Sequence, residues 1–372
     1  METRAEFRSF VDKEIAPYAE QFDRTETVPP DVFGKLSERR YWGALLPRDV
    51  GGLGLDMASF AALHEEVGRG CSSVRGLLTA HAMVAFAVQK WGTGEQKARW
   101  LPALASGEVI AAFALTEPEA GSDAGCITSQ ARKEAGGYRL AGRKKWITGA
   151  QVAGLFLVFA RTERGIAAFL VERETPGLDI APISGLLGAR ASMLGEVVLH
   201  DCHLPPSALL GPEGFGVGAV VTGALDLGRY SVACGCVGII DGCLDASSSY
   251  ASQRVSGSET LRDKQLIRRM ISDMVCDLWA ARLLCRRAGD LKEAGDPETI
   301  GATCMAKYFA SEAAARASRN AVQIHGANGC SRAYPVERYF RDAKVMEIIE
   351  GSSEIQQLIL VDEASRGRAL VR

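Results

Sequence analysis

The stretch EIIEGSSEIQ, residues 347–356, combines residue types that could carry acid–base chemistry. Glu350 follows the apolar pair Ile348 and Ile349, and a glycine and two serines come directly after it. Taken alone, a glutamate in this setting is typical of a surface position beside a loop. A carboxylate works best as a general base when its pKa is raised toward the working pH. What surrounds Glu350 therefore decides between the two interpretations.

Three further stretches carry polar groups and small residues in patterns that favour ligand binding. In FALTEPEAGSDAG, residues 113–125, a strand opens into a loop of exposed N–H groups and hydroxyls, which suits a ring with polar and aromatic edges. In KWITG, residues 145–149, Trp146 and Thr148 are two apart on one expected strand and so share a face. In QIHGANG, residues 323–329, small residues at a helix end admit another chain or a pyrophosphate. A tight turn and a core tryptophan are the alternatives for the first two.

Composition narrows the classes of protein to consider. The 372 residues include 43 basic and 45 acidic side chains, and this balance gives no electrostatic reason to bind nucleic acid or an anionic membrane. The charged start METRAEFRSFVDKE is unlike a secretory signal, and uncharged stretches fall short of the roughly 18–20 residues of a membrane span. Ten cysteines without a CxxC pair and five unclustered histidines predict reduced thiols, no metal site and a cytoplasmic location.

Hydrophobic periodicity divides the chain into three zones. Residues 1–112 show helical spacing, and TGEQKARWLPALASGE is expected as a helix entry followed by a second helix broken at its proline. Residues 113–212 hold short runs rich in branched and aromatic residues, which predict antiparallel strands of a sandwich or barrel. Residues 213–372 return to helical spacing, with an Ala-rich helix that ends at Gly326 and is typical of a bundle core. The sequence predicts a mainly α protein with a central β domain.

These motifs resemble, in order and spacing, those of the acyl-CoA dehydrogenase family. The stretches are GTGEQKARWLPALASGE, FALTEPEAGSD, KKWIT, QIHGANG and YPVERYFRDAKVMEIIEGSSEIQ, and the likeness covers about residues 5–360. The resemblance implies an FAD flavoprotein with an N-terminal helical domain, a β-barrel or sandwich domain and a C-terminal four-helix bundle, assembled as a dimer or tetramer. It also implies an oxidoreductase acting on CH–CH groups of a CoA or acyl-carrier-protein thioester, with an acceptor such as electron-transfer flavoprotein.

The resemblance further implies which residues bind the cofactor. Those expected along the flavin ring are Phe113, Leu115, Thr116, Ser122, Trp146 and Thr148. Those expected to reach a neighbouring subunit's FAD, or the adenosine-diphosphate half across the interface, are Arg254, Ser256, Gln265, Gln323, Gly326 and Ala327. Just after the catalytic segment, Ser352 and Glu354 would touch FAD. A cofactor site of this kind is shared between chains, so a single chain would not work alone.

The same resemblance gives Glu350 its role. It occupies the position of the family's usual base, which removes the proton α to the thioester while the flavin takes the β-hydride. Burial beside Ile348, Ile349 and the flavin would raise the pKa of this carboxyl by desolvation. Gly351 would let the backbone turn tightly against the substrate. Some relatives carry the base on the helix equivalent to LDLGRYSV, where Gly228 stands in this chain.

Residues around the acyl thioester follow from the same comparison. Asp226 and Arg229 match positions near the substrate, and Ser122 and Gly351 are also expected beside it. For Asp226 and Arg229 an ordinary helical i, i+3 ion pair is the alternative.

Departures from the family pattern concern the FAD clamp and the carrier. The common RxxFG reads RVSGS from Arg254, so Gly257 replaces the Phe, and Asp362 replaces an arginine frequent after the catalytic segment. Three stretches, GRGCSSVRGLLTAHAM, GRYSVACGCVGII and RDAKVMEIIEGSSE, resemble the homologues of polyketide clusters that help build hydroxymalonyl- or methoxymalonyl-type extender units. A small acyl group on an acyl carrier protein, in secondary metabolism, is therefore the leading expectation.

Three alternatives stay open at the level of sequence. One is an ordinary acyl-CoA dehydrogenase of fatty or branched-chain acid catabolism. A second is a flavin oxidase or monooxygenase on the same fold, although such relatives commonly lack the glutamate kept here. A third is a binding protein that has lost the cofactor, which would be colourless and unable to take up FAD.

Overall fold

The computed structural model describes residues 3–365. Its first part is helical up to Ser106, as the periodicity predicts. A capping box between Thr3 and Glu6 starts the first helix by satisfying N–H groups that have no partner within it. The helices of this part are α1 (Arg4–Glu14), α2 (Ala19–Thr25), α3 (Pro30–Glu38), α4 (Met57–Gly70), α5 (Ser72–Trp91) and α6 (Gly94–Ser106).

One expectation for this part is wrong. The stretch TGEQKARWLPALASGE forms a single helix, α6, and Pro102 lies inside it. A capping box of Thr93 and Gln96 starts the helix, and buried Trp100 and Leu104 hold it against the core. The fixed φ of proline is close to the helical value. Burial of the apolar face therefore outweighs the lost hydrogen bond.

The central part is an eight-stranded sheet in the order β6-β7-β3-β2-β4-β5-β8, with β1 paired to β4. The pairs β3–β7 and β4–β5 are antiparallel, as expected. In contrast, β1 and β2 each pair with β4 in parallel, because the chain does not reach β4 from either strand through a tight hairpin. The strands are β1 (Ala111–Ala114), β2 (Gln130–Glu134), β3 (Gly137–Ile147), β4 (Leu155–Thr162), β5 (Gly165–Glu172), β6 (Leu178–Pro182), β7 (Gly195–Leu204) and β8 (Leu209–Leu210).

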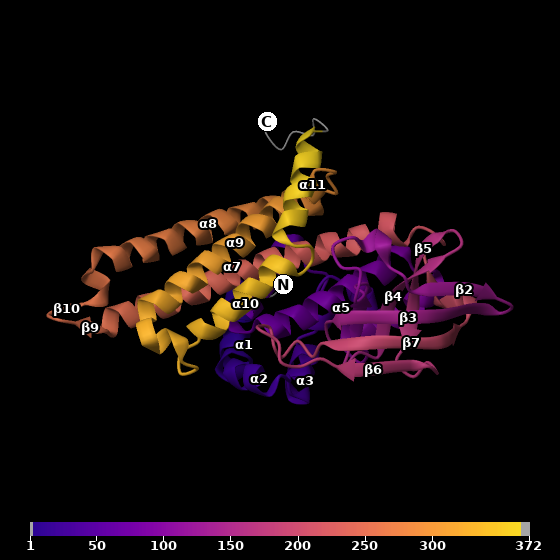
Figure 1. The fold of residues 1–372 in the computed structure, drawn as a ribbon, viewed down its shortest axis with the longest axis horizontal. Coiled ribbons are helices and arrows are strands. Elements are labelled where there is room, and N and C mark those ends of the chain that lie inside the picture. The colour runs from indigo at the N-terminus through magenta and orange to yellow at the C-terminus, as the bar shows by residue number, and fades with distance from the viewer. Residues whose placement is uncertain (1–2, 366–372) are drawn as a thin grey trace.

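The last part is a bundle of long helices that extends away from the sheet (Figure 1). A small hairpin of β9 (Val255–Ser256) and β10 (Glu259–Thr260) lies at its far end. All alanines of the Ala-rich helix except Ala315 are buried, which confirms that this helix is core. The helices are α7 (Thr222–Gln253), α8 (Gln265–Glu293), α9 (Thr299–His325), α10 (Val336–Ile348) and α11 (Ser353–Ser365).

The centre of the bundle is its most apolar helix. The segment Gly216–Gln253, which joins a π-helical turn to α7, is long and apolar enough to cross a membrane, but 89% of its apolar window is buried inside the protein. It contacts α4, α5, α8 and α9 and serves as the central helix of the bundle. The observed α–β–α arrangement confirms the predicted fold class. The divisions after residues 112 and 212 stay predictions, since β1 already begins at Ala111.

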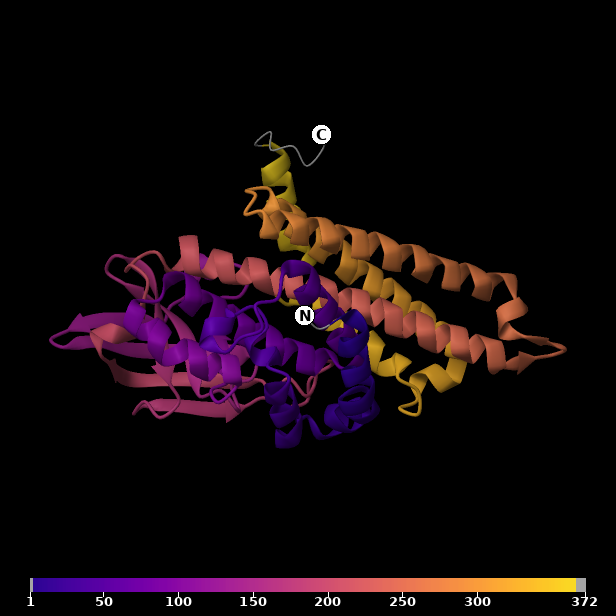
Figure 2. The same ribbon diagram turned by 180° about the vertical axis from the view of Figure 1, so that it is seen from behind.

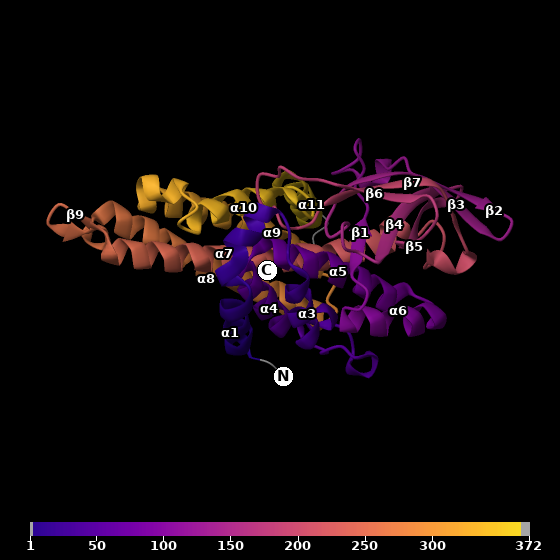
Figure 3. The ribbon, with the colours of Figure 1, turned by 90° about the horizontal axis from the view of Figure 1, so that it is seen from below.

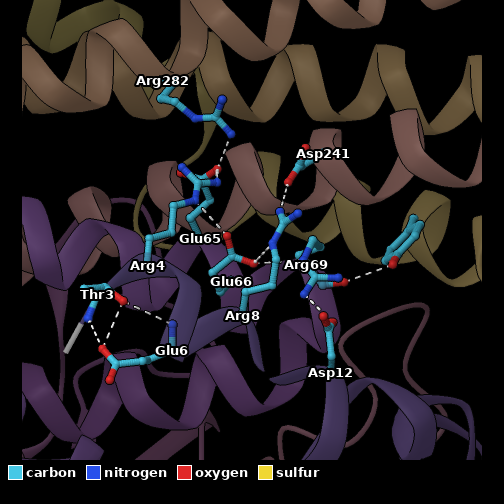
Figure 4. Close-up of polar contacts among 11 residues, drawn as sticks. Thr3, Arg4, Glu6, Arg8, Asp12, Glu65, Glu66, Arg69, Asp241 and Arg282 are labelled. Carbon is cyan, nitrogen blue, oxygen red and sulfur yellow. Dashed lines mark hydrogen bonds and ion pairs between the residues drawn. The ribbon is translucent and has the colours of Figure 1, made fainter. Parts of the chain in front are cut away.

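The N-terminal helices join the bundle to the sheet. Seen from behind and from below, they lie at the middle of the molecule, and α5 packs on both α7 and β1 (Figures 2 and 3). The side chain of Glu66 on α4 is buried and accepts hydrogen bonds from Arg4, Arg8 and Arg69 (Figure 4). Arg8 also reaches Asp241 on α7 at 2.5 Å. The arginines neutralise the negative charge of Glu65, Glu66 and Asp241. Because two of them lie on α1, the ion pairs also hold α1 against the bundle.

Candidate active site

Glu350 lies in the short connection between α10, which ends at Ile348, and α11, which begins at Ser353. Its backbone is left-handed, with φ of 55°, and Gly351 follows with φ of 91°. A left-handed conformation is free of steric cost for glycine but costs a glutamate on the order of 1 kcal/mol or more. Such strain persists only where neighbouring contacts hold the backbone.

Three side chains hold this connection through its carbonyl oxygens. Lys307 on α9 donates to the carbonyls of Glu347, at 3.1 Å, and Gly351, at 2.8 Å. Arg229 on α7 donates through Nε to the carbonyl of Glu350 at 3.1 Å, and Gln356 donates to the same oxygen at 3.2 Å. The strained turn is therefore fixed by α7, α9 and α11 together.

The carboxylate of Glu350 points at a glycine on α7. A Cβ placed on Gly228 would lie 2.6 Å from Oε2 of Glu350 and 2.8 Å from Sδ of Met83 on α5. Oε2 is fully enclosed and has no hydrogen-bond partner among residues 3–365, although Glu350 as a whole is half-buried. A side chain at position 228, where some relatives carry their base, would therefore occupy the space that the Glu350 carboxylate fills in this chain.

Electrostatics at Glu350 combine burial with nearby positive charge. Burial raises the pKa of the Glu350 carboxyl, and the charges of Arg229, Arg75 and Lys307 offset only part of that rise. Burial lowers the pKa of Lys307 to about 8. A carboxyl with a raised pKa and an unpartnered oxygen is suited to accept a proton from carbon.

The expected alternative for Asp226 and Arg229, an ion pair with each other, is wrong. Asp226 pairs with Lys292 on α8, and Arg229 turns to the backbone of Glu350. Arg229 is buried and lies beside Glu350, and its contact with substrate stays a prediction. Oδ1 of Asp226 is buried and has no hydrogen-bond partner within the described residues, so this carboxylate oxygen remains an available acceptor.

A second group of predicted residues gathers where β1 and β3 end. The loop after β1 is tied to β3 by a buried ion pair, Lys144 with Glu117 at 2.7 Å. Burial alone would raise the pKa of Glu117, but hydrogen bonds from Lys144, Ser129 and Thr128 hold it at about 2. Burial lowers the pKa of Lys144 to about 8, so both groups are charged at neutral pH and the loop stays fixed.

Trp146 and Thr148 do not share a strand face as predicted. The strand β3 ends at Ile147 after a bulge, and Trp146 is left-handed, with φ of 62°. The bulge turns the indole outward, where half of its surface is exposed. The N–H of Lys145 donates to the carbonyl of Thr116 at 2.8 Å, so the loop and this bulge lie side by side.

One helix links this region to Glu350. A Cβ on Gly76 of α5 would have Oγ of Ser192 at 3.5 Å and the Thr148 methyl at 4.0 Å as its nearest neighbours. Seven residues further along α5, on the same side of the helix, Met83 encloses the Glu350 carboxylate. The Thr148 methyl group and the Glu350 carboxylate therefore lie beside the same face of α5, about two turns or roughly 10 Å apart along the helix.

The remaining predicted cofactor residues lie elsewhere in the chain. Arg254 and Ser256 are exposed at the β9–β10 hairpin, at the opposite end of the molecule from β3 (Figure 1). The end of α9 is close to this hairpin, because His325 stacks on Tyr250 with ring centres 4.2 Å apart. The exposed residues of this distal group are Arg254, Ser256, Gln265, Gln323, Gly326 and Ala327. A single chain does not bring them to the β3 region.

Other predicted residues have simpler surroundings. Ser122 and Glu354 are exposed, and Ser352 is partly buried beside Glu350. Phe113 lies in β1, and Leu115 and Thr116 follow the end of that strand. Leu115 is buried. Two surface hollows lie along α7, α8 and α9. The residues that line the first include Ser248 and Ser272, those that line the second include Leu266 and Asn320, and neither set includes Glu350.

Sequence reasoning missed several side chains around Glu350. Lys307, Gln356, Arg75 and Met83 were not predicted, and all reach it from other helices. One signal was available: Lys307 is a lone lysine on the buried face of an Ala-rich helix. Lysine is almost never fully buried unless its charge has partners.

Sequence profiles of the acyl-CoA dehydrogenases match all three parts of the chain: the N-terminal domain at 1–108, the middle domain at 112–202 and the C-terminal domain at 214–364. The human short-chain specific acyl-CoA dehydrogenase is 38% identical over 365 residues, which is 96% of this chain and 88% of the human protein. This chain belongs to the acyl-CoA dehydrogenase family. Its members are FAD-dependent oxidoreductases that act on CH–CH groups, which confirms the predicted cofactor and enzyme class.

Two solved structures show how closely the fold is kept within the acyl-CoA dehydrogenase family. The glutaryl-CoA dehydrogenase of Mycobacterium smegmatis in complex with FADH2 has a TM-score of 0.93 at 29% identity, covering 99% of this chain and 95% of that one. FkbI, described for biosynthesis of the methoxymalonyl extender unit of Fk520, has a TM-score of 0.90 at 32% identity, covering 98% and 99%.

The residues present fit a flavin. A half-exposed indole and the Thr148 side chain lie together at the end of β3, next to Gly76, which contributes no side chain. A flat ring with apolar faces and polar edges fits an aromatic surface beside a hydroxyl.

Gly228→Ala tests the geometry at the carboxylate. The new methyl group would meet the ends of two flexible side chains, so we expect little change in stability and a displaced Glu350. Flavin reduction by an acyl thioester should slow about tenfold or more, because misplacing a catalytic group by about 1 Å costs up to 10²-fold. Stopped-flow absorbance measures the rate. Gly34→Ala, on α3 with nothing near its added Cβ, is the control; equal rates in both variants would contradict the assignment.

Proposed function

We propose that the protein is an FAD-dependent acyl-thioester dehydrogenase in which Glu350 removes the α proton of the substrate. The observation that carries this proposal is the enclosed Oε2 of Glu350, which has no hydrogen-bond partner in the described part of the chain and is held by a strained turn beside Gly228. A buried carboxylate without a partner costs stability, so a chain keeps one only where it has a use.

The chemistry at this site balances as a two-electron oxidation of the acyl group. The Cα–H bond breaks and its proton goes to Oε2 of Glu350. Bound FAD supplies the acceptor for the hydride that leaves the β carbon. The electron pair of the Cα–H bond forms the trans Cα=Cβ bond. Lys307 and Arg229 hold the turn that aims the carboxylate, and the enclosing Met83 keeps water from replacing it.

The cofactor-binding residues divide into two groups in this proposal. Phe113, Leu115, Thr116, Ser122, Trp146 and Thr148 face the flavin of their own chain, with Ser352 and Glu354 beyond the base. The distal group of Arg254, Ser256, Gln265, Gln323, Gly326 and Ala327 serves the FAD of a second copy. The distance between the two groups within one chain supports this division (Figure 1). Asp226, Arg229, Ser122 and Gly351 stay the proposed substrate contacts.

A second copy also accounts for an apolar face on α8. Val275, Trp279 and Leu283 are spaced by four residues and are exposed, the last two by 58% and 60%. Leu266, at the start of the same helix, is 70% exposed. Large apolar side chains aligned on one helix mark an interaction surface. We therefore propose that α8 lies in the interface of a homo-oligomer, either a dimer or a tetramer.

Mixing two defective chains tests the shared site. Trp146→Ala and Arg254→Glu chains should each bind little FAD, because each lacks one half of every site. When the two are co-expressed with different tags and purified on both, each two-fold dimer obtained holds one chain of each kind, so about one of its two sites should be intact. The FAD bound per chain, measured by absorbance after tandem purification, should rise accordingly. If the mixture stays as empty as its components, each site lies within one chain.

The substrate carrier is the finer part of the proposal. The three stretches that resemble the homologues of polyketide clusters meet in the structure: Met83 comes from the first, Gly228 from the second and Glu350 from the third. The three stretches that resemble the homologues of polyketide clusters therefore meet around Glu350, the proposed base. The likeness to FkbI supports a small acyl group on an acyl carrier protein, as in the supply of polyketide extender units. A CoA thioester, as in ordinary acyl-CoA dehydrogenases, is the competing carrier.

The carrier preference is measured by titrating flavin reduction. We expect a small acyl group on an acyl carrier protein to half-saturate reduction at a concentration roughly tenfold or more below that of its CoA thioester, which is a difference of about 1.4 kcal/mol in binding. Gly257 and Asp362, where the family pattern for holding FAD and CoA is broken, give the reason. Equal half-saturation, or a preference for a long fatty acyl-CoA, would favour the ordinary catabolic role.

The remaining partners follow from the reaction. Reduced flavin must pass its electrons on, and we propose electron-transfer flavoprotein as the acceptor. Oxygen consumption without an added acceptor would indicate an oxidase instead. We also propose a cytoplasmic location, since the ten cysteines are all free thiols in the structure.

Glu350→Gln tests the base itself. The amide keeps the shape but cannot accept the proton, so flavin reduction should fall about 10²–10⁴-fold while FAD and the acyl thioester still bind. Because burial raises the folded-state pKa of Glu350, ionisation there destabilises the fold as pH rises through that value. The variant should therefore be at least as stable as the parent at neutral pH, by thermal melting.

The pH profile gives a second measure in the same experiment. The parent rate should increase with pH, with a midpoint above the ordinary glutamate value, and Glu350→Gln should lack this step. Glu347→Gln, three residues earlier, where the carboxylate is largely buried and already paired with Lys344, is the matched control and should keep the step. A near-parental rate in Glu350→Gln would place the base elsewhere.

A further inference from the structure

Lys307 on α9 is a buried cation that has no carboxylate partner within the described part of the chain. None of its surface is exposed, and its two hydrogen bonds go to backbone carbonyls, at 3.1 Å to Glu347 and at 2.8 Å to Gly351. By contrast, the equally buried Lys144 reaches the carboxylate of Glu117 at 2.7 Å. Lysine is almost never fully buried unless its charge has partners, so these two carbonyls are what keep the ammonium group inside.

The two carbonyls lie on either side of the proposed base. Glu347 is in the last turn of α10, and Gly351 directly follows Glu350. The other two side chains that hold the connection reach only the carbonyls of Glu350 and Gly351. Among the described side chains, Lys307 is therefore the one that joins the end of α10 to the residue after the base, so it spans the strained turn.

A positive charge suits the end of α10. The last four carbonyls of a helix have no partner within it, and the negative end of the helix dipole lies there. The carbonyl of Glu347 is one of these four, because α10 ends at Ile348. An ammonium group binds such a carbonyl more strongly than a neutral amine does, since a charge-assisted hydrogen bond is roughly twice as strong as a neutral one. The charge of Lys307, and not only its length, therefore holds the turn.

The titratable groups that face Lys307 come from two helices and from the turn itself. Cys236 and Arg229 lie on α7, Glu347 lies on α10, and Glu350 lies between α10 and α11. Burial lowers the pKa of Lys307 to about 8; Arg229 acts in the same direction, and Cys236 and the two glutamates act against it. Burial raises the pKa of Cys236 to about 12, so Lys307 loses its proton well before that thiol does.

We propose that Lys307 is a positioning residue for the abstraction of the α proton: its ammonium group fixes the turn that aims Glu350, so flavin reduction requires Lys307 in the protonated form. This rests on the proposed acyl-thioester dehydrogenase function. When the lysine is neutral, its amine still has N–H donors, but its bonds to the two carbonyls weaken and the left-handed turn relaxes. The reaction then has an upper pH limit, set by Lys307, in addition to the lower limit set by Glu350.

The pH dependence of flavin reduction tests whether the charge is required. Stopped-flow absorbance follows the FAD-loaded protein after mixing with a short acyl thioester, and the rate in the parent should fall about tenfold as pH rises above about 8. Because the pKa of Lys307 is lower in the fold than in the unfolded chain, its deprotonation stabilises the fold as pH rises, so this fall in rate is not unfolding. A parental rate that stays level above pH 8 would overturn the proposal.

Substitutions assign the upper pH limit to one lysine. Lys307→Met should reduce flavin about tenfold more slowly than the parent at pH 7 and should show no further fall at high pH, whereas Lys307→Arg, which stays charged, should move the fall to higher pH. Lys344→Met is the matched control, because Lys344 is exposed near the end of α10 and pairs with the side chain of Glu347; this variant should keep the parental profile.

A second buried lysine gives the competing explanation of an upper pH limit. Burial also lowers the pKa of Lys144 to about 8, and Lys144 holds the loop after β1 through Glu117. A fall in rate above pH 8 that persists in Lys307→Met would come from that pair and would overturn the role of Lys307.

Hydrogen exchange measures the turn without any catalysis, so it separates this proposal from the function on which it rests. In peptides that cover residues 347–356, Lys307→Met should exchange faster than the parent at pH 7, and the difference should shrink at pH 9, where the parental lysine is neutral. Faster exchange without flavin reduction by any thioester supports the role of Lys307 in holding the turn and refutes the dehydrogenase. Equal exchange at pH 7, with flavin reduction by a thioester, supports the dehydrogenase and refutes the role of Lys307.

Discussion

The structure depends on keeping one carboxylate in a place where it has no partner. Taking a charge from water into a protein interior costs several kcal/mol, and Oε2 of Glu350 recovers none of this through a hydrogen bond. The nearby charges of Arg229, Arg75 and Lys307 keep ionisation possible without forming a direct ion pair with it. A direct ion pair would have lowered the pKa and made the group a poor base.

The need to hold an unpartnered carboxylate in place explains why side chains from several helices contact the turn at Glu350. A left-handed glutamate would relax if its carbonyl were free, and Lys307, Arg229 and Gln356 prevent this from three different helices. On the other side, the buried pair of Lys144 and Glu117 fixes the loop after β1 against β3. The helix α5 connects the two, because it packs on both the bundle and the sheet.

The elongated shape has a further consequence. The β9–β10 hairpin, next to Arg254, lies at the far end of the bundle from the sheet that carries Trp146 (Figure 1). A cofactor as long as FAD can use both groups only if they come from different copies of the chain. Oligomerisation would then complete the active site and also cover the apolar side of α8.

The sequence by itself determined the order of helical and strand zones, the buried Ala-rich helix and the family. It also singled out Glu350 and Gly228 as the two positions at which members of the family carry the base. These follow from local periodicity and from motifs, which are contiguous in the chain. The assignments of the cofactor and substrate residues stay predictions. The tertiary structure decided that Asp226 pairs with Lys292, that a bulge turns Trp146 outward, and that α6 continues through Pro102. It also brought Lys307, Gln356 and Arg75 to Glu350. Arg75 and Glu350 are 275 residues apart, and no periodicity reports an electrostatic interaction of that kind, because burial and electrostatics act through space rather than along the chain.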